Sequence, residues 1–251
     1  MCDLLVLCGG QGTRLRMVVN DRPKPMVMID GRPFIDFVVE PFVRQGIRRV
    51  ILCTGYKGEH FENWYASRNR PYELLFSPEE SPLGTAGAIS NAAGLIRNNP
   101  FLVVNGDSLC ETNPEQLLAF HAAKGGCATL TLTPASRRTD VGFVTMNQNS
   151  RLSAFAEKQP GGMECFHNAG IYVFERSILG RLPASRPCSL ETDLLPHLLE
   201  QGVYGFACNA PLYDIGTPER LEQFRAYAES GSMMATKRAS SYESRGAVDV
   251  L

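Results

Sequence analysis

Residues 1–16 read MCDLLVLCGGQGTRLR, an apolar run that passes directly into a glycine-rich turn. Glycines stand at positions 9, 10 and 12, and Thr13 and Arg14 follow them. Glycine adopts backbone angles closed to other residues and lets a ligand approach the main chain closely. A glycine-rich turn after a buried strand is typical of a phosphate-binding loop. The Arg14 guanidinium would add a permanent positive charge beside it.

The turn departs from two familiar phosphate-binding motifs. It lacks the Lys-Ser/Thr pair that ends a P-loop, and Leu15 stands where a dinucleotide-binding motif has its third glycine. A tight turn with structural glycines is the alternative interpretation. The stretch RPKPM, residues 22–26, favours phosphate binding, because prolines on both sides stiffen the backbone and hold Lys24 out as a second fixed cation. A solvated surface loop is the alternative there.

Composition excludes several classes of protein. The 251 residues are 44% apolar and 20% charged, which is ordinary for a soluble globular protein. A net charge of −1 gives no general attraction for nucleic acid or an acidic membrane, so we expect neither as a partner. No run approaches the ~18 apolar residues of a membrane span. Eight cysteines without a CxxC pair fit buried free thiols, and these features predict a cytoplasmic protein.

Short apolar runs alternate with helical patterns in the first half of the chain. Runs of nearly continuous apolar character are typical of strands covered on both faces of a parallel sheet, so the pattern predicts an α/β fold. Pro41 is expected to kink the first helix, and Asn113 to cap the third. Strands are predicted at residues 4–8, 48–54, 72–76, 101–107 and 127–133, and helices at residues 33–46, 85–99 and 113–126.

The pattern changes near residue 140. Alternating stretches at residues 141–146, 151–158 and 168–174 predict short strands in a mixed or antiparallel region. Neither a repeat nor a long linker divides the chain. We therefore expect a single domain over residues 1–227, followed by a small, polar tail over residues 228–251.

Two aspartates stand at the ends of apolar stretches. Asp107 ends the run FLVVNGD, at the edge where open parallel sheets hold their ligands. Asp214 ends the run LYD, just ahead of a helix that Thr217 would cap and Pro218 would begin. If the two carboxylates converge beside phosphates, they form a magnesium site completed by water and phosphate oxygens. Helix-capping or turn residues are the alternative.

Seven stretches occur in the order typical of one known family: LCGGQGTRLR, RPKP, SPLGTAGA, NGDSL, AEK, NAGIY and YDIGTPE. Over roughly residues 3–225 the chain resembles the sugar-1-phosphate nucleotidyltransferases. The resemblance implies a Rossmann-like, mostly parallel sheet flanked by helices, with a mixed-strand sugar-binding half. It implies transfer of a nucleoside monophosphate from an NTP to a sugar 1-phosphate, with Mg²⁺ as cofactor and pyrophosphate as leaving group.

Such a reaction needs no general base, because the attacking phosphate oxygen is already ionised. Positioning and charge neutralisation would carry the catalysis. By the resemblance, Arg14 and Lys24 would be the catalytic cations, and Asp107 and Asp214 would hold the metal. The resemblance assigns the nucleotide to Leu7, Gly9, Gly10, Gly12, Thr13, Glu79, Gly84 and Thr85, and the sugar phosphate to Gly142, Glu157, Lys158 and Asn168. An ordinary surface pair is the alternative for Glu157 and Lys158.

The stretch SPEESPLGTAGA bears on the choice of base. Glu79 stands where relatives that use uracil or thymine resemble one another in having glutamine. A carboxylate accepts the adjacent N1–H and N2–H₂ donors of guanine but repels the carbonyls of uracil and thymine, so Glu79, or its neighbour Glu80, favours GTP. Solvation of the loop is the alternative.

The compact length and the stretch PLGTAGAI most resemble the D-glycero-D-manno-heptose 1-phosphate guanylyltransferases of surface-polysaccharide synthesis. Two departures bear on this: Pro41 lies within a helix, and Val141-Gly142 replaces a tyrosine-glycine pair near the sugar. The alternatives are a uridylyl- or thymidylyltransferase for an N-acetylmuramic acid, mannose or glucose 1-phosphate, and a non-catalytic subunit that binds a nucleotide sugar. Whether the chain forms a homo-oligomer stays open.

Overall fold

The strand β1 (Leu4–Leu7) lies inside a large sheet and pairs in parallel on both sides, with Leu4 opposite Val50 and Leu102. Its partners are β4 (Arg49–Thr54) and β6 (Phe101–Asn105), and β5 (Glu73–Pro78) pairs in parallel with β4. This computed structural model describes residues 2–10, 21–135, 143–156, 165–182 and 187–230. The predicted parallel core is confirmed, and β1 is buried on both faces as its continuous apolar sequence requires.

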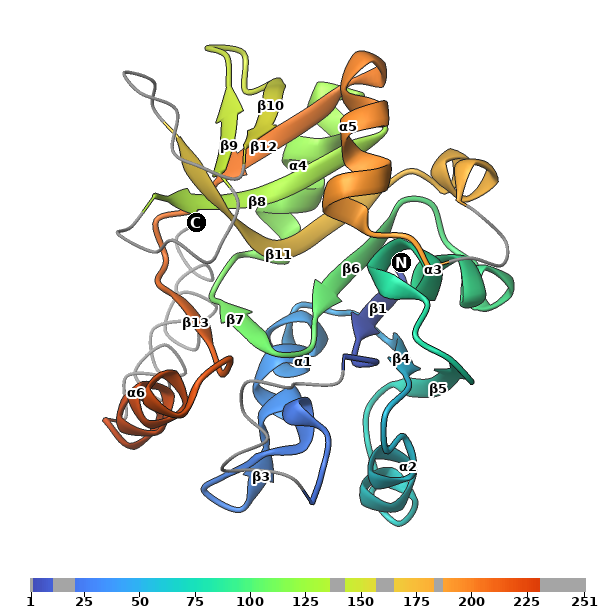
Figure 1. Ribbon diagram of the computed structural model, residues 1–251, viewed down its shortest axis with the longest axis vertical. Helices are drawn as coiled ribbons and strands as arrows, with labels where there is room; N and C mark the ends of the chain where they lie inside the picture. Colours follow the sequence, from blue (N-terminus) through green and yellow to red (C-terminus); the bar gives the residue numbers. More distant parts are fainter. Residues whose placement is uncertain (1, 11–20, 136–142, 157–164, 183–186, 231–251) are drawn as a thin grey trace, which may run out of the picture.

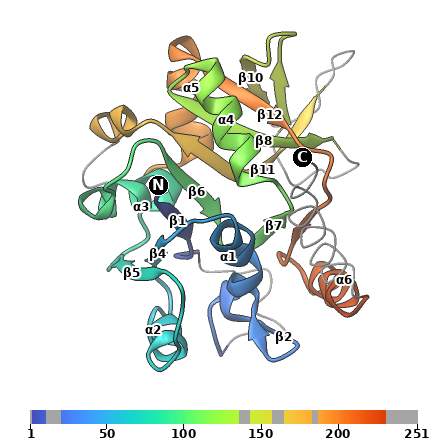
Figure 2. The ribbon, with the colours of Figure 1, turned by 180° about the vertical axis from the view of Figure 1, so that it is seen from behind.

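The second half of the sheet is mixed, as predicted. The strand β11 (Phe166–Phe174) runs antiparallel to β6, β8 and β9, whereas β12 (Val203–Ala207) runs parallel to β8. The strand order is β10-β9-β11-β6-β1-β4-β5, with β8 and β12 branching from β11. The remaining strands of this half are β8 (Ala128–Pro134), β9 (Phe143–Met146) and β10 (Leu152–Ala156). Figures 1 and 2 show the sheet from its two sides.

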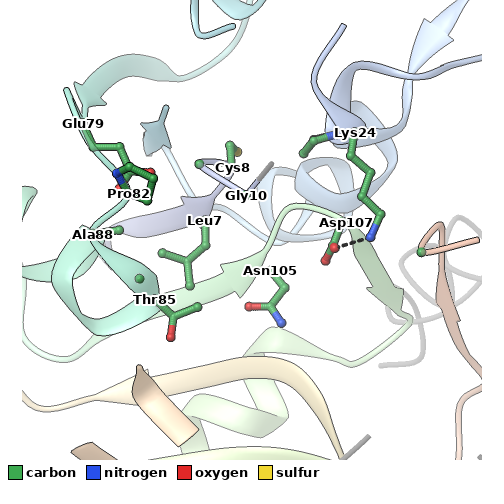
Figure 3. A pocket seen from close by; sticks show the side chains of 14 residues that line it. Leu7, Cys8, Gly10, Lys24, Glu79, Pro82, Thr85, Ala88, Asn105 and Asp107 are labelled. Atoms are coloured by element: carbon green, nitrogen blue, oxygen red, sulfur yellow. Dashed lines mark hydrogen bonds and ion pairs between the residues drawn. The ribbon is translucent and has the colours of Figure 1, made fainter. Parts of the chain in front are cut away.

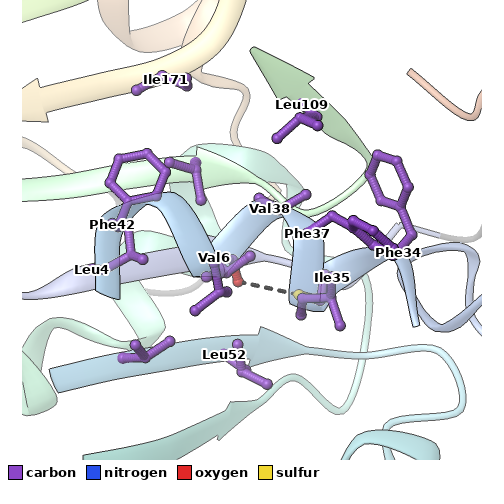
Figure 4. Packing of buried hydrophobic residues seen from close by; sticks show 14 of the residues in the cluster. Leu4, Val6, Phe34, Ile35, Phe37, Val38, Phe42, Leu52, Leu109 and Ile171 are labelled. Carbon is purple, nitrogen blue, oxygen red and sulfur yellow. Dashed lines mark hydrogen bonds between the residues drawn. The ribbon is translucent and has the colours of Figure 1, made fainter. Parts of the chain in front are cut away.

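Successive residues of β1 serve opposite faces of the sheet, because side chains alternate along a strand. Leu4 and Val6 belong to one buried cluster, and Leu5 to the other. On the first face, α1 packs its apolar side against β1 and β4 (Figure 4). The two layers around the sheet are formed by α1 (Phe34–Arg44), α2 (Glu59–Tyr65), α3 (Gly84–Asn91), α4 (Pro114–Lys124), α5 (Leu195–Leu198) and α6 (Pro218–Glu229).

The predicted helix caps are confirmed. The Asn113 side chain accepts a hydrogen bond from the Gln116 amide at 3.1 Å, and Thr217 does the same for Arg220 at 3.4 Å. Pro41 lies inside α1 without ending it.

The single helix predicted over residues 85–99 is wrong, because α3 ends at Asn91 and a short 3₁₀ turn follows at Ala93–Leu95. Beyond that turn, the Asp3 carboxylate accepts the Arg97 and Asn98 amides at 2.6 and 2.8 Å, so these two residues bond to Asp3 rather than continuing a helix.

All eight cysteines are free thiols, and six of them are buried, which confirms the prediction made from their spacing. Among the described residues, no helix combines the length and apolar character needed to cross a membrane.

Candidate active site

The chain reverses direction across the sheet at β1. It passes from β1 to β4 and β5 on one side, then returns to form β6 on the other. In open α/β sheets, ligands bind at the carboxyl ends of the strands beside such a reversal. A cavity of about 430 Å³ lies there. It is lined by Leu7, Cys8, Gly9, Gly10, Lys24, Pro25, Glu79, Pro82, Gly84, Thr85, Ala88, Asn105, Asp107 and Gly216 (Figure 3).

One end of the cavity carries an ion pair between Lys24 and Asp107. The Lys24 Nζ atom lies 2.6 Å from Asp107 Oδ2. Lys24 begins a short 3₁₀ turn between Pro23 and Pro25, and the Met26 amide donates to the Pro23 carbonyl at 2.9 Å. The rigid support predicted for this lysine is therefore present. Only 14% of the Lys24 side chain is exposed, so its charge is directed into the site rather than into bulk water.

A two-stranded ladder brings Asp214 to the same end. The strand β7 (Ser108–Cys110) pairs with β13 (Leu212–Asp214), which places Asp214 opposite Ser108, and the Ile215 amide donates to the Asp107 carbonyl at 3.2 Å. A Cβ atom added at Gly216 would lie 2.7 Å from Asp214 Oδ1 and 3.6 Å from Lys24 Nζ. The two predicted aspartates thus lie in one neighbourhood, with Lys24 beside them.

Arg220 adds a further cation that could not be selected from the sequence motifs alone. It lies in the first turn of α6, and its Nη1 atom is 3.2 Å from Asp214 Oδ1. The Gly216 amide donates to the same oxygen at 2.8 Å. Charge and hydrogen bonding together hold the Asp214 carboxylate in position. Arg220 belongs to the stretch YDIGTPER, so its place directly after a family motif was the available signal.

The donor set at this end suits a hard divalent cation. Asp107 and Asp214 offer carboxylate oxygens, the ligand type that Mg²⁺ prefers. Within the described residues, no group of three or more His, Cys, Asp or Glu side chains is arranged to bind a metal. A cation held by the two aspartates would therefore take its other ligands from phosphate and water, as is usual for Mg²⁺ at phosphate sites.

The opposite end of the cavity carries Glu79, directly after β5 (Figure 3). The Glu79 amide donates to Thr54 at 2.8 Å, and the Leu83 amide donates to Glu79 Oε2 at 3.2 Å. A Cβ atom at Gly9 would lie 2.3 Å from Glu79 Oε1, and one at Gly55 would lie 2.6 Å from it. Both positions therefore require glycine for the carboxylate to lie against the backbone. Burial raises the pKa of Glu79, partly offset by the Leu83 hydrogen bond.

The wall between the two ends is formed by the start of α3. Gly84 has φ +71°, and a Cβ atom there would lie 2.6 Å from the Cys188 carbonyl oxygen. That carbonyl accepts the Ala86 amide at 2.9 Å, and the Leu190 amide donates to Thr85 Oγ1 at 2.7 Å. The structure therefore places the predicted residues Gly84 and Thr85 in the cavity wall and gives Gly84 a steric reason to be glycine.

Asn168, predicted to contact the sugar, does not line the cavity. Its amide nitrogen donates to the Tyr172 hydroxyl at 2.8 Å, and its Oδ1 atom accepts the Gly170 amide at 3.0 Å. These bonds stabilise an irregular stretch of β11 that lies behind Asn105. Asn105 lines the cavity and was not selected from the sequence, although it lies two residues before Asp107. Its position at the carboxyl end of β6 was the available signal.

Several predicted residues lie outside the described part of the chain. They are Gly12, Thr13, Arg14, Gly142, Glu157 and Lys158. The tail from residue 231 onward also lies outside it. Among the described residues, the structure brings together Leu7, Gly9, Gly10, Lys24, Glu79, Gly84, Thr85 and Asp107 around one cavity, with Asp214 adjacent.

The family model described as "Nucleotidyl transferase" matches residues 4–230, which is nearly the whole chain. The protein belongs to this family. Its resemblance to the sugar-1-phosphate nucleotidyltransferases is thereby confirmed at the level of the family.

Two curated relatives are named for guanylyl transfer. The chain is 38% identical over 221 residues to the mannose-1-phosphate guanylyltransferase of Mycobacterium tuberculosis, covering 86% of this chain and 62% of that protein. It is 34% identical over 221 residues to the D-glycero-alpha-D-manno-heptose 1-phosphate guanylyltransferase of Aneurinibacillus thermoaerophilus, covering 86% of this chain and 94% of that one. The chain thus spans less than two thirds of the mycobacterial relative.

Solved structures show the same fold. HddC from Yersinia pseudotuberculosis, in a crystal structure described as complexed with GMP-PN, is 30% identical with a TM-score of 0.77, covering 89% of this chain and 97% of that one. A putative glucose-1-phosphate thymidylyltransferase from Bacillus anthracis gives a TM-score of 0.80 at 17% identity, which shows the fold alone.

Proposed function

We propose that this protein transfers the guanylyl group of GTP to a sugar 1-phosphate and releases pyrophosphate. The observation that carries the proposal is the Lys24–Asp107 pair beside Asp214 at one end of a cavity whose other end presents the Glu79 carboxylate. The first set suits a triphosphate and the second suits guanine. Relatives named for guanylyl transfer support the same reaction.

Lys24 would act on the triphosphate. Two polyanions must meet in this reaction, so the chief barrier is charge repulsion. The Lys24 ammonium lies at the cavity wall on a rigid turn, and a fixed cation needs no reorganisation as charge moves to the departing pyrophosphate. Arg14 stays the predicted second cation for the same phosphates.

Asp107 and Asp214 would hold Mg²⁺. When bound, this ion would neutralise the phosphate oxygens and orient the α-phosphate for attack. The chain's own part is to keep both carboxylates in place. The β7–β13 ladder fixes their separation, and the Gly216 amide and Arg220 fix the Asp214 oxygen.

Glu79 would select the base. Its carboxylate lies against the Gly9 and Gly55 backbones at the cavity wall, so closely that a Cβ atom on either glycine would overlap it. Guanine presents N1–H and N2–H₂ side by side, and an ionised carboxylate accepts both. Uracil and thymine present carbonyls that the same group repels.

A manno-configured sugar 1-phosphate is the acceptor that we propose. The relatives named above act, by their names, on mannose 1-phosphate and on D-glycero-D-manno-heptose 1-phosphate. The heptose 1-phosphate stays the predicted acceptor. Gly142, Glu157, Lys158 and Asn168 stay the predicted sugar-phosphate contacts, and a role in surface-polysaccharide synthesis follows only if the heptose is used.

A panel assay tests the proposal. Pyrophosphate release would be measured from GTP, UTP, dTTP and CTP, each with mannose, D-glycero-D-manno-heptose, glucose and N-acetylmuramic acid 1-phosphates. We expect release with GTP and a manno-configured acceptor. Release with UTP or dTTP at equal efficiency would refute the choice of guanine. Release with no combination would favour a non-catalytic member that binds a nucleotide sugar.

A further inference from the structure

A second cavity, of about 670 Å³, lies on the outer side of α1. Its walls come from α1, from the turn between β2 (Met28–Ile29) and β3 (Arg32–Pro33), and from the segment that links α2 to β5. Figure 2, which shows the molecule from the side opposite to Figure 1, labels α1 and α2. The lining of the second cavity shares no residue with the active-site cavity. It therefore belongs to a separate region of the surface.

The lining of this second cavity is strongly cationic. Two carboxylates, Asp36 and Glu40, stand among its side chains. The whole chain, by contrast, carries 25 Lys and Arg against 26 Asp and Glu. The lining of this cavity is thus more positively charged than the molecule as a whole, and such a local excess of positive charge favours an anionic ligand. The five arginines of the lining are Arg32, Arg44, Arg48, Arg68 and Arg70.

The two carboxylates are already engaged. Glu40 binds Arg32, at 2.9 Å between its Oε2 and the Arg32 Nη2 atom, and it also binds Arg44. Asp36 accepts a hydrogen bond from the Tyr65 hydroxyl, and burial raises the pKa of this aspartate. Among the described residues, neither acid forms an ion pair with Arg48, Arg68 or Arg70, although the charge of Arg68 acts to lower the pKa of Asp36.

Three arginines are left with no carboxylate partner among the described residues. Within the described parts of the chain, Arg48 donates only to the Val43 and Ile47 carbonyls, at 2.8 and 3.0 Å. Arg70 donates to the Tyr65 and Arg68 carbonyls, also at 2.8 and 3.0 Å. Each of these contacts uses one nitrogen of a group that carries five N–H donors. The remaining donors and the full positive charges are free to bind phosphate oxygens.

Aromatic rings stand next to these charges. The Arg68 guanidinium lies 3.6 Å from the centre of the Trp64 ring, and Trp64 itself is only half-buried. Tyr72, also half-buried, lines the same cavity. The Arg68 guanidinium covers one face of Trp64, and the parts of the two rings that stay accessible offer a planar base a stacking surface beside the cations that would contact phosphate.

We propose that this cavity binds a nucleoside di- or triphosphate, with the phosphates on Arg48, Arg68 and Arg70 and the base against Trp64. This site is separate from the active-site cavity, and the proposal for it does not rest on the proposed catalytic function.

Trp64 is the only tryptophan of the chain, so its fluorescence reports on this cavity alone. Titration of the full chain with GDP, with excitation at the red edge of tryptophan absorption, is expected to give a saturable change. Inorganic tripolyphosphate should bind more weakly than GDP, and guanosine should not bind. The Lys24→Ala variant, altered in the other cavity, should keep the GDP response.

Arg68→Glu is the test variant. Among the described contacts, the Arg68 guanidinium donates no hydrogen bond to the backbone, so its replacement leaves the hydrogen bonds of Arg70 to the Tyr65 and Arg68 carbonyls in place. We expect affinity for GDP to fall by about tenfold or more, as for loss of a charge-assisted contact. Arg48→Gln should weaken binding in the same direction. Arg225→Ala is the matched control, since this arginine pairs with Glu222 on α6, away from the cavity.

Calorimetry measures GDP binding without depending on the environment of the Trp64 indole. Wild type is expected to show a GDP-binding event whose affinity is about tenfold or more lower in Arg68→Glu. If catalysis at the other cavity is assigned wrongly, this difference in affinity persists. Four outcomes would overturn the proposal: no saturable response, unchanged affinity in Arg68→Glu, loss of the response in Lys24→Ala, or GDP binding no tighter than tripolyphosphate.

Discussion

Lys24 and Asp107 contact one another at the wall where a triphosphate would bind, so substitution of Lys24 tests the proposed phosphate site. Lys24→Ala should lower kcat by roughly 10²- to 10³-fold, because it removes a fixed charge that stabilises the transition state. Steady-state pyrophosphate release measures the effect. Lys124→Ala, on α4, is the control and should be close to wild type. A folded Lys24→Ala protein with normal turnover would contradict the assignment.

Glu79→Gln should change the choice of base. An amide offers one donor and one acceptor, which matches the carbonyl and N–H of uracil better than the two donors of guanine. We expect the ratio of kcat/KM for GTP to that for UTP to fall by about tenfold or more, the scale of one charged hydrogen bond. Glu80→Gln is the matched control, because Glu80 is exposed beside it. If Glu80→Gln changes the preference instead, Glu79 is the wrong residue.

The pH dependence of base selection follows from the raised pKa of Glu79. A raised pKa means that the carboxylate takes up a proton at a higher pH than an ordinary glutamate, whose pKa is about 4.3. The ionised form needed by guanine is therefore lost at a higher pH than in an ordinary glutamate, as the pH falls through the raised value. KM for GTP should increase on acidification. The Glu79→Gln variant should lack this increase, and an identical pH profile in both proteins would count against the mechanism.

Individual site residues could be predicted from the sequence where their immediate neighbours along the chain indicate their role. Lys24 between two prolines and Asp107 after an apolar strand could both be selected from their neighbours. Gly216 and Arg220 were not selected, although they follow Asp214 by two and six residues and contact its carboxylate. The pairing of β13 with β7, which brings this group beside Asp107, has no local signal.

Among the elements, the first turn of α3 depends most on a single residue. Gly84 combines φ +71° with a contact to the Cys188 carbonyl that leaves no room for a side chain. Gly84→Ala should lower the free energy of unfolding by about 2 kcal/mol or more, since a strained backbone and a clash add. Urea unfolding followed by circular dichroism measures it.

Gly94→Ala provides the comparison for Gly84. Gly94 follows the same helix and lacks a positive φ, and a Cβ atom added there would meet no neighbouring side chain or backbone within 4 Å. This substitution should be nearly neutral. Equal losses of stability in the two variants would show that the steric argument for Gly84 fails.

Elements were easier to predict than their pairing. Apolar runs and caps identified β1, β4, β6, α4 and the start of α6, because those signals are local. The β7–β13 ladder joins segments about a hundred residues apart, and no local pattern specifies that partner. The end of α3 was also missed, and the Asp3 carboxylate that holds the Arg97 amide beyond it lies 94 residues earlier in the chain.

For the whole molecule, one continuous sheet separates two buried clusters, and β1 contributes to both. Loss of either cluster would expose the same central strands. We therefore expect a single cooperative unfolding transition, with Trp64 fluorescence and far-ultraviolet circular dichroism changing together. This outcome would support the predicted single domain over residues 1–227. Two separate transitions would contradict it.

The α/β class and the change to mixed strands after residue 140 could be predicted from hydrophobic patterning, because buried parallel strands and alternating strands differ in composition. The position of the cavity could be predicted only in part. It depends on the order β6-β1-β4, and strand order is a property of the assembled sheet.

The fate of the α-phosphorus of GTP shows whether the protein transfers a guanylyl group to a sugar 1-phosphate. GTP labelled at that position would be incubated with Mg²⁺ and a manno-configured sugar 1-phosphate, and the products separated. We expect the label to appear in a GDP-sugar, with one unlabelled pyrophosphate released for each, and we expect Asp107→Asn to abolish most of this transfer. Label remaining entirely in GTP, or transfer undiminished in a folded Asp107→Asn protein, would contradict the proposed function.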